Sequence, residues 1–308
     1  MLEFVEVATE VLDKGEPIDV VFLYCQKTFD KVPHSRLINK LSALGVSSKI
    51  ILWIKEWLRD RKQRVVMNGE GSKWINVTSG VPQGSVQGPL LFIVYVNDLE
   101  HNLENELWKF ADDAKLLLQT GSVDKNNIAK KDLKELSDWA KKWQMAFNSS
   151  KCKVMHLGRL NKNPCVKYKF DGVELEEIKE EKDLGIIIND TLKVGPQCLK
   201  AAKKGNQILG LIARTFASRE KEIIMKLYKS LVRPHLDYCI QAWRPHLTKD
   251  IELLEKVQRR ATKLIRDCKA LSYKERLEKV NLTTLEIRRE RADMIEVWKI
   301  VNDIDKVQ

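Results

Sequence analysis

The order of apolar and polar positions predicts that the first part of the chain mixes strands with helices. Residues Ile18–Tyr24 (IDVVFLY) form a short apolar run, which predicts a buried strand. The segments QRVVMNG (63–69) and KWINVTSG (73–80) alternate apolar and polar residues around a glycine-containing turn, which predicts a β-hairpin. Further short strands are expected in the segments KVMHLG (153–158), VKYKF (166–170) and DLGIIIN (183–189).

Helical periodicity occurs in longer segments and becomes the only pattern near the end of the chain. Gly45 is expected to end one of these helices before the next begins. After Pro196 every pattern up to Val301 is helical. We therefore predict an α+β domain of residues 1–195 followed by an all-helical domain of residues 196–308. The helices expected before Pro196 are LEFVEVATEVL (2–12), SRLINKLSALG (35–45), SSKIILWIKEWLRD (47–60), PLLFIVYVNDLEHNL (89–103) and residues 126–143.

Two short segments interrupt these elements and contain candidate chemistry. The segment SGVPQGSVQGP (79–89) holds three glycines and two prolines, so we expect a loop. The segment LWKFADDAKLLLQ (107–119) places two acids between apolar arms, which predicts a hairpin with Asp112 and Asp113 near its tip.

Charge separates the two predicted domains. The chain has 308 residues with 44% hydrophobic and 31% charged residues, which is ordinary for a globular protein with a buried core. Its formal net charge is +11, but residues 197–308 contain 25 basic and 15 acidic residues and so contribute +10. Such an excess suits contact with a phosphate backbone, and a solvated lysine-rich helical surface is the alternative interpretation.

Several classes of protein are disfavoured by the sequence. No run of about 20 apolar residues is present, so we expect no membrane span. The N-terminal residues lack the basic start and apolar stretch of a signal peptide. Six cysteines lie far apart without a CxxC pair, which favours a reducing intracellular compartment, cytoplasm or nucleus, over a secreted disulfide framework.

Adjacent carboxylates on a tight hairpin are a candidate metal site. Asp112 and Asp113 would repel each other if both pointed to one place, unless a cation compensated their charge. Magnesium prefers carboxylate oxygens and leaves room for substrate phosphates. On this short motif alone, an acidic pair in a solvated turn is the more common case, so the surrounding motifs decide between the two interpretations.

The ordered motifs resemble those of reverse transcriptases from LINE-type (non-LTR) retrotransposons related to jockey elements. The chain carries FLYCQKTFDKVPH, SGVPQGSVQGPLLF, FADDAKL and FNSSKCKVMHLG in that order. In that family the first motif has the pattern LDxxKAFDxV, the second is SGVPQGSVLGPLLF and the third is FADD. The resemblance continues into LVRPHLDYCIQAWRPH and LEKVQRRATKLIR, so it spans almost the whole chain.

The resemblance implies an α+β right-hand polymerase palm with partial fingers, followed by an all-helical thumb and post-thumb region. It implies an RNA-directed DNA polymerase that uses two Mg²⁺ ions, an RNA template, a DNA primer and deoxynucleoside triphosphates. No membrane contact is implied, and protein partners are unknown. Asp112 and Asp113 would be metal ligands. Lys151 would stabilise or protonate the leaving pyrophosphate, with a solvated strand lysine as the alternative.

The same resemblance assigns residues to substrate binding. Phe29 would be a steric gate against a 2′-hydroxyl, with a core aromatic residue as the alternative. The templating pair and incoming nucleotide would contact Pro82, Gln83, Gly84 and Ser85, and the last of these is also suited to cap the following helix. Gln87 stands where the family has leucine, and it would weaken packing if it pointed inward.

One departure affects catalysis. The first motif has Tyr24 where the family has its metal-binding aspartate, and Asp30 lies six residues further on, roughly 20 Å along an extended strand. We expect Asp30 to be a cap or turn residue. The preceding fingers segments and the endonuclease domain are also expected to be missing from what resembles a truncated, decayed copy. We predict a polymerase without activity; a non-catalytic nucleic-acid-binding remnant and a chain without function are the alternatives.

Overall fold

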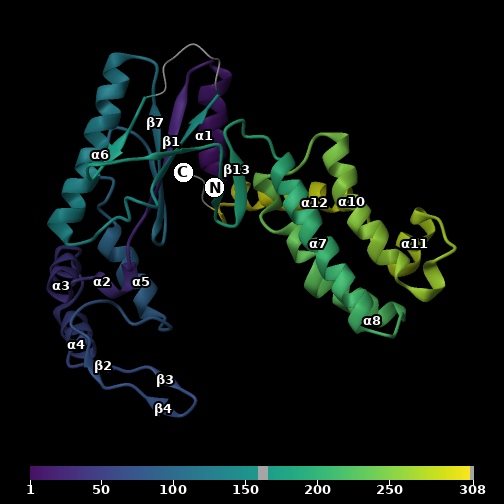
Figure 1. Cartoon of the computed structure of the whole chain (residues 1–308), viewed down its shortest axis with the longest axis horizontal. Helices are drawn as coiled ribbons and strands as arrows, with labels where there is room; N and C mark the ends of the chain where they lie inside the picture. Colours follow the sequence, from purple (N-terminus) through teal and green to yellow (C-terminus); the bar gives the residue numbers. More distant parts are fainter. Residues whose placement is uncertain (159–165, 306–308) are drawn as a thin grey trace. The chain divides into compact units, whose positions relative to one another are not determined.

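The computed structural model describes residues 1–158 and 166–305, which form two compact units (Figure 1). We call Val11–Lys179 the sheet unit. Residues Met1–Glu10 and Glu180–Gln308 make up the other, which we call the helical unit. Helix α1 (Leu2–Asp13) begins in the helical unit and ends in the sheet unit.

A five-stranded sheet is the centre of the sheet unit, with the strand order β11-β8-β1-β7-β6. Its middle strand is the predicted apolar run, β1 (Ile18–Tyr24), and six of its seven residues are buried. β1 pairs antiparallel with both β7 (Asp113–Gln119) and β8 (Lys153–Leu157). The outer strands are β6 (Leu107–Phe110), antiparallel to β7, and β11 (Glu176–Ile178), parallel to β8.

Helix α6 (Val123–Trp143) covers one face of this sheet, as Figure 1 shows. Its buried residues recur at helical spacing, and they pack with apolar side chains from alternate positions of β1 and β7. The short strands β9 (Lys169–Phe170) and β10 (Val173–Glu174) form a hairpin, and Phe170 and the preceding Tyr168 add two aromatic side chains to this core. The cluster includes Val21, Leu23, Leu116, Leu118, Ala129, Leu133, Leu136, Ala140, Tyr168 and Phe170.

A second core in the sheet unit lies among the helices that follow β1. These are α2 (Thr28–Lys31), α3 (His34–Ala43), α4 (Ser48–Leu58) and α5 (Gln87–Val96). The predicted hairpin between α4 and α5 is present as the paired strands β2 (Lys62–Gln63) with β5 (Ile75–Asn76) and β3 (Val66–Met67) with β4 (Glu70–Gly71).

After the first turns of α1, the helical unit resumes at Glu180 with a two-stranded sheet and continues as helices, in agreement with the pattern after Pro196. Its largest fully buried side chains are Trp243 and Tyr228. The elements are β12 (Glu180–Asp183), β13 (Ile186–Asn189), α7 (Gly195–Thr215), α8 (Lys221–Leu227), the π-helix η1 (Tyr228–Val232), α9 (Pro234–Asp237), the 3₁₀ turn η2 (Ile240–Ala242), α10 (Thr248–Lys263), the 3₁₀ turn η3 (Arg266–Cys268), α11 (Tyr273–Val280) and α12 (Leu285–Val301).

The predicted mixture of helix and sheet is confirmed, and the bounds of several elements differ from the prediction. The strand expected over residues 183–189 is β13, which begins at Ile186, and Asp183 ends β12. The helix expected over residues 89–103 is α5, which ends at Val96. Beyond it, Asp98 accepts hydrogen bonds from the Lys40 ammonium and the Trp139 indole, so this carboxylate is held toward α3 and α6. In the segment VKYKF only Lys169 and Phe170 form a strand. Within the described residues, no helix has the length and apolarity needed to cross a bilayer.

A buried carboxylate ties α6 to the segment that leads into β6. Asp132 is fully buried and accepts hydrogen bonds from the backbone N–H groups of Glu104 and Asn105 at 3.1 and 2.9 Å. The Asn105 side-chain amide donates a further bond at 2.8 Å. Because β6 and β7 form one hairpin, this contact also positions the acidic pair at its tip.

We predict that Asp132→Ala lowers the free energy of unfolding of the sheet unit by about 2–4 kcal/mol, because three partly buried hydrogen bonds to this carboxylate are lost. The measurement is urea denaturation of the full chain. The exposed Asp138 on the same helix is the matched control, and Asp138→Ala should change the free energy by no more than about 0.5 kcal/mol. Equal effects of the two substitutions would contradict the anchoring role of Asp132.

Candidate active site

The register of the central strands brings Tyr24 next to the acidic pair. Tyr24 is the last residue of β1 and lies directly opposite Asp113, the first residue of β7. Residues opposite each other in an antiparallel pair point to the same face of a sheet. Leu23 and Ala114, one position away on each strand, belong to or contact the core beneath α6. Tyr24 and Asp113 therefore point to the face of the sheet opposite α6.

Asp112 lies in the turn between β6 and β7, as the sequence predicted. Phe110 pairs with Asp113, so Ala111 and Asp112 form a two-residue turn, and Ala111 has a left-handed backbone with a φ of 52°. The Asp112 side chain is exposed, and its Oδ2 accepts a 3.4 Å hydrogen bond from the hydroxyl of Thr28 in α2. The acidic pair is thus flanked by the end of β1 and by the helix that follows it.

Cys25 is a neighbour of this pair that the sequence interpretation did not single out. Burial raises the pKa of the Cys25 thiol to about 12, and the negative charges of Asp112 and Asp113 act in the same direction. The thiol is therefore neutral at physiological pH. Cys25 and Thr28 both lie within four residues of Tyr24, and that proximity in the first motif was the available signal for them.

The loop predicted over residues 79–89 is docked on the segment that carries Phe29. The backbone N–H of Gly80 donates to the carbonyl oxygen of Val32 at 2.8 Å, and that of Val81 donates to the carbonyl oxygen of Phe29 at 2.7 Å. Gly80 has a φ of +93°, and a Cβ there would lie 2.6 Å from the carbonyl oxygen of Phe29. Only glycine permits this approach of the two backbones.

Three of the predicted substrate-binding residues line one pocket of about 440 Å³. These are Phe29, Pro82 and Gln83, and the basic residues Arg61 and Lys62 line the same pocket. The Phe29 ring also stacks on Phe92, with ring centroids 5.2 Å apart. Phe29 therefore both contacts the core and lines the pocket, so its interpretation as a core aromatic residue does not exclude its interpretation as a steric gate.

The remaining loop residues form the start of α5. Gly84 is exposed with a φ of +77°, and the Ser85 hydroxyl accepts a hydrogen bond from the backbone N–H of Gly88 at 2.9 Å. This is the kind of bond expected of a capping serine, although the residue directly before the helix is Val86, which makes no side-chain cap bond. Gln87 is exposed, so its side-chain amide is not buried, although the related motif has leucine at this position. The expectation that Asp30 is a cap or turn residue is wrong, because Asp30 lies inside the short helix α2, where it accepts a 3.1 Å hydrogen bond from the Gln83 amide.

Lys151 lies in a turn that is attached to the end of β1. The backbone N–H of Asn148 donates to the carbonyl oxygen of Tyr24 at 2.7 Å, and the Lys151 N–H donates to the carbonyl oxygen of Asn148 at 2.8 Å. The Lys151 side chain itself is exposed. The turn therefore starts beside Tyr24, while the position of the ammonium group is not fixed by a packed neighbour.

The donor set beside Tyr24 is small for a pair of divalent cations. Asp112 and Asp113 supply carboxylates, and Tyr24 supplies a phenol on the facing strand. Among the described residues, no group of three or more His, Cys, Asp or Glu side chains is arranged to hold a metal ion. A site for two magnesium ions needs more anionic oxygens than two adjacent carboxylates supply, so these residues alone do not fit it.

Comparison with known proteins identifies the family. A family model described as reverse transcriptase (RNA-dependent DNA polymerase) matches residues 8–210. The RNA-directed DNA polymerase from mobile element jockey of Drosophila funebris is 29% identical over 272 residues, which cover 83% of this chain and 30% of the relative. The probable RNA-directed DNA polymerase from transposon BS of Drosophila melanogaster is 30% identical over 288 residues, 84% of this chain and 30% of the relative.

A solved structure agrees with the fold. Apo telomerase from Candida tropicalis superimposes with a TM-score of 0.50 and 12% sequence identity, over 91% of this chain and 48% of that chain. The present chain spans about 30% of the length of the two curated relatives. The family model covers about two thirds of the chain and includes the β1, β7 and β8 strands that form the candidate site. The chain therefore belongs to the reverse transcriptase family of RNA-dependent DNA polymerases, and its relatives are polymerases of non-LTR retrotransposons.

Proposed function

We propose that this chain is the polymerase portion of a non-LTR retrotransposon reverse transcriptase in which Tyr24 has disabled the metal site. In this proposal residues 1–195 form the palm with partial fingers, and residues 196–308 form the thumb and post-thumb region. An RNA template, a DNA primer and deoxynucleoside triphosphates are the substrates of the intact enzyme. The observation that supports the metal-site assignment is the direct pairing of Tyr24 with Asp113 across β1 and β7.

The physical argument concerns the group that faces the acidic pair. A phenol has a reference pKa of about 10, so it is neutral near pH 7. Magnesium binds hard anionic oxygens and dehydrates reluctantly, which makes a neutral phenol a poor substitute for a carboxylate. The Tyr24 side chain is also larger than that of aspartate, so it occupies space beside Asp113 that an ion would need.

The other assigned residues keep their proposed roles on the same geometry. Phe29, Pro82 and Gln83 line the pocket in which an incoming nucleotide would bind, and Arg61 and Lys62 add positive charge there, while Gly84 and Ser85 follow directly in the chain. Lys151 is exposed in the turn attached to Tyr24, from which its flexible side chain is able to reach a phosphate. These roles depend on the proposed polymerase site and are wrong if that assignment is wrong.

A second candidate function is nucleic-acid binding without catalysis, which the +10 charge of residues 197–308 favours. In the helical unit, Lys200, Lys203 and Lys204 of α7 line a pocket of about 660 Å³. Lys203 and Lys204 are exposed, whereas burial lowers the pKa of Lys200, which donates to the carbonyl oxygen of Gly185. The exposed pair is therefore the better candidate for phosphate contacts.

We predict that the unmodified chain gives no measurable primer extension on an RNA template, even in excess Mg²⁺. Tyr24→Asp should tighten Mn²⁺ binding, measured by electron paramagnetic resonance, by about tenfold or more, which corresponds to ~1.4 kcal/mol. The added carboxylate completes a cluster of three acids, and Asp112→Ala in the Tyr24→Asp background should remove the gain.

Two results would overturn parts of this assignment. If the unmodified chain extends the primer robustly and Asp112→Ala abolishes this activity, the assignment of the active site stands and the argument that Tyr24 disables it is wrong. Robust extension that survives Asp112→Ala would reject the site itself.

For the second function, we predict that the full chain binds single-stranded RNA with an affinity that falls steeply between ~50 and ~200 mM salt. Lys203→Gln with Lys204→Gln should lower the slope of log affinity against log salt by about 1.4, because each phosphate contact on a single strand contributes ~0.7. Lys299→Gln is the control, since that ammonium already pairs with Glu296 and Asp305. If the affinity for RNA does not change with salt concentration, the basic residues form only a solvated surface and this second function is wrong.

A further inference from the structure

The outer side of α6 carries lysines that neither the sheet core nor the candidate active site uses. The buried residues Ala129, Leu133, Leu136 and Ala140 face the sheet. Lys130, Lys134 and Lys141 are exposed on the same helix, and the first two are four residues apart, which is about 6 Å along a helix axis. Because Tyr24 and Asp113 point to the opposite face of the sheet, these lysines belong to a different surface.

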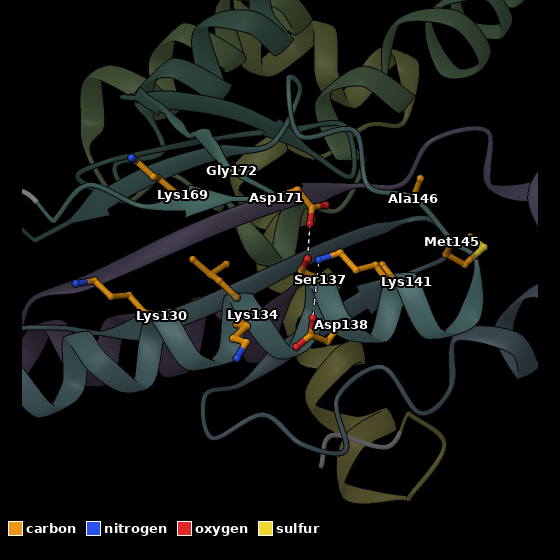
Figure 2. Close-up of a pocket in the computed structure, with 12 residues that line it drawn as sticks. Lys130, Lys134, Ser137, Asp138, Lys141, Met145, Ala146, Lys169, Asp171 and Gly172 are labelled. Carbon is orange, nitrogen blue, oxygen red and sulfur yellow. Dashed lines mark hydrogen bonds and ion pairs between the residues drawn. The ribbon is translucent and has the colours of Figure 1, made fainter.

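A groove of about 640 Å³ runs between this side of α6 and the β9–β10 hairpin. Figure 2 shows Lys130, Lys134 and Lys141 arising from the helix, with Lys169 and Asp171 on the other wall. Leu133, Ala140 and Met145 add apolar lining. The groove therefore combines a row of cations with apolar surface.

The two carboxylates of the groove are already engaged. Asp171 accepts a hydrogen bond from the Ser137 hydroxyl, and Asp138 lies 3.9 Å from the Lys141 ammonium. Lys169 sits near Glu174, whose pKa is lowered first by Lys167 and more weakly by Lys169. Within the described part of the chain, Lys130 and Lys134 form no ion pair closer than 4 Å. Their charge is the uncompensated charge of the groove.

We propose that this groove binds single-stranded RNA through its phosphates, as a second nucleic-acid site on the face of the sheet opposite the candidate active site. Lysine ammonium groups in a row on one helix suit a chain of successive phosphates, whose charge supplies most of the affinity of sequence-independent binding. RNA is chosen over another polyanion because the chain belongs to a family of RNA-dependent polymerases. The inference rests on that family and on no property of the metal site.

The test compares two charge-matched triple variants of the full chain. Lys130→Gln, Lys134→Gln and Lys169→Gln remove groove lysines, whereas Lys125→Gln, Lys131→Gln and Lys142→Gln remove lysines of α6 that do not line the groove. Lys125 and Lys131 already pair with Glu16 and Glu104. Circular dichroism checks that both variants fold, and the experiments are done in EDTA so that a defective metal site has no influence.

The readouts are the salt dependence of binding to a single-stranded RNA oligonucleotide and the position of photo-cross-links from 4-thiouridine in that oligonucleotide. The groove variant should lower the slope of log affinity against log salt by about 2, at ~0.7 per contact, and should lose cross-links to α6 and β9. The control should keep both. Equal slopes for the two variants, or no cross-links to α6 and β9 in the unmodified chain, would overturn the proposal. A competition experiment gives a third result that would overturn the proposal. If a polyglutamate peptide displaces the RNA from the groove at equal concentration, the groove fits an acidic protein segment equally well.

Discussion

The arrangement of the sheet unit depends on the register of β1 between β7 and β8. Alternate residues of β1, Val21 and Leu23, are buried in the core beneath α6. A slip of one residue would exchange these side chains with Val20 and Phe22, which are buried on the opposite face, so the packing on both faces of the strand holds the register. The same register sets Tyr24 opposite Asp113. The geometry of the candidate site is therefore a consequence of core packing.

The other end of β1 is fixed by a polar contact rather than by apolar packing. Asp19 is buried, and it accepts hydrogen bonds from the Tyr168 hydroxyl at 2.8 Å and engages Nδ1 of His156 at 2.6 Å. His156 belongs to β8 and pairs with Asp19 across the two strands. A buried carboxylate is costly without partners, so this contact favours the one alignment that supplies both. The apolar core and this network thus specify the same register from two directions.

The sequence predicted the elements well where a local pattern determines them. The apolar run of β1, the hairpin with the FADD turn and the hydrogen bond of the Ser85 hydroxyl at the start of α5 follow from spacing and residue type within short segments. The end of α5 was not predicted, because Asp98 is held by Lys40 and Trp139, which lie 58 and 41 residues away. The proximity of Thr28 to Asp112, over 84 residues, and the groove between α6 and Lys169 have the same origin in tertiary contacts.

The proposed loss of the metal site has little cost for the fold. Tyrosine is favoured in strands, and Tyr24 extends β1 without interrupting its pairing to β7. Asp112 is exposed in its turn, and solvent screens its repulsion with Asp113, so the acidic pair does not need a bound cation to remain in place. A carboxylate at position 24 would instead add a third negative charge to the cluster, which a metal ion would have to compensate. The side chains that fill the core beneath α6 and the side chains proposed to bind metal are separate sets, and for that reason a substitution that removes the chemistry is compatible with an intact fold.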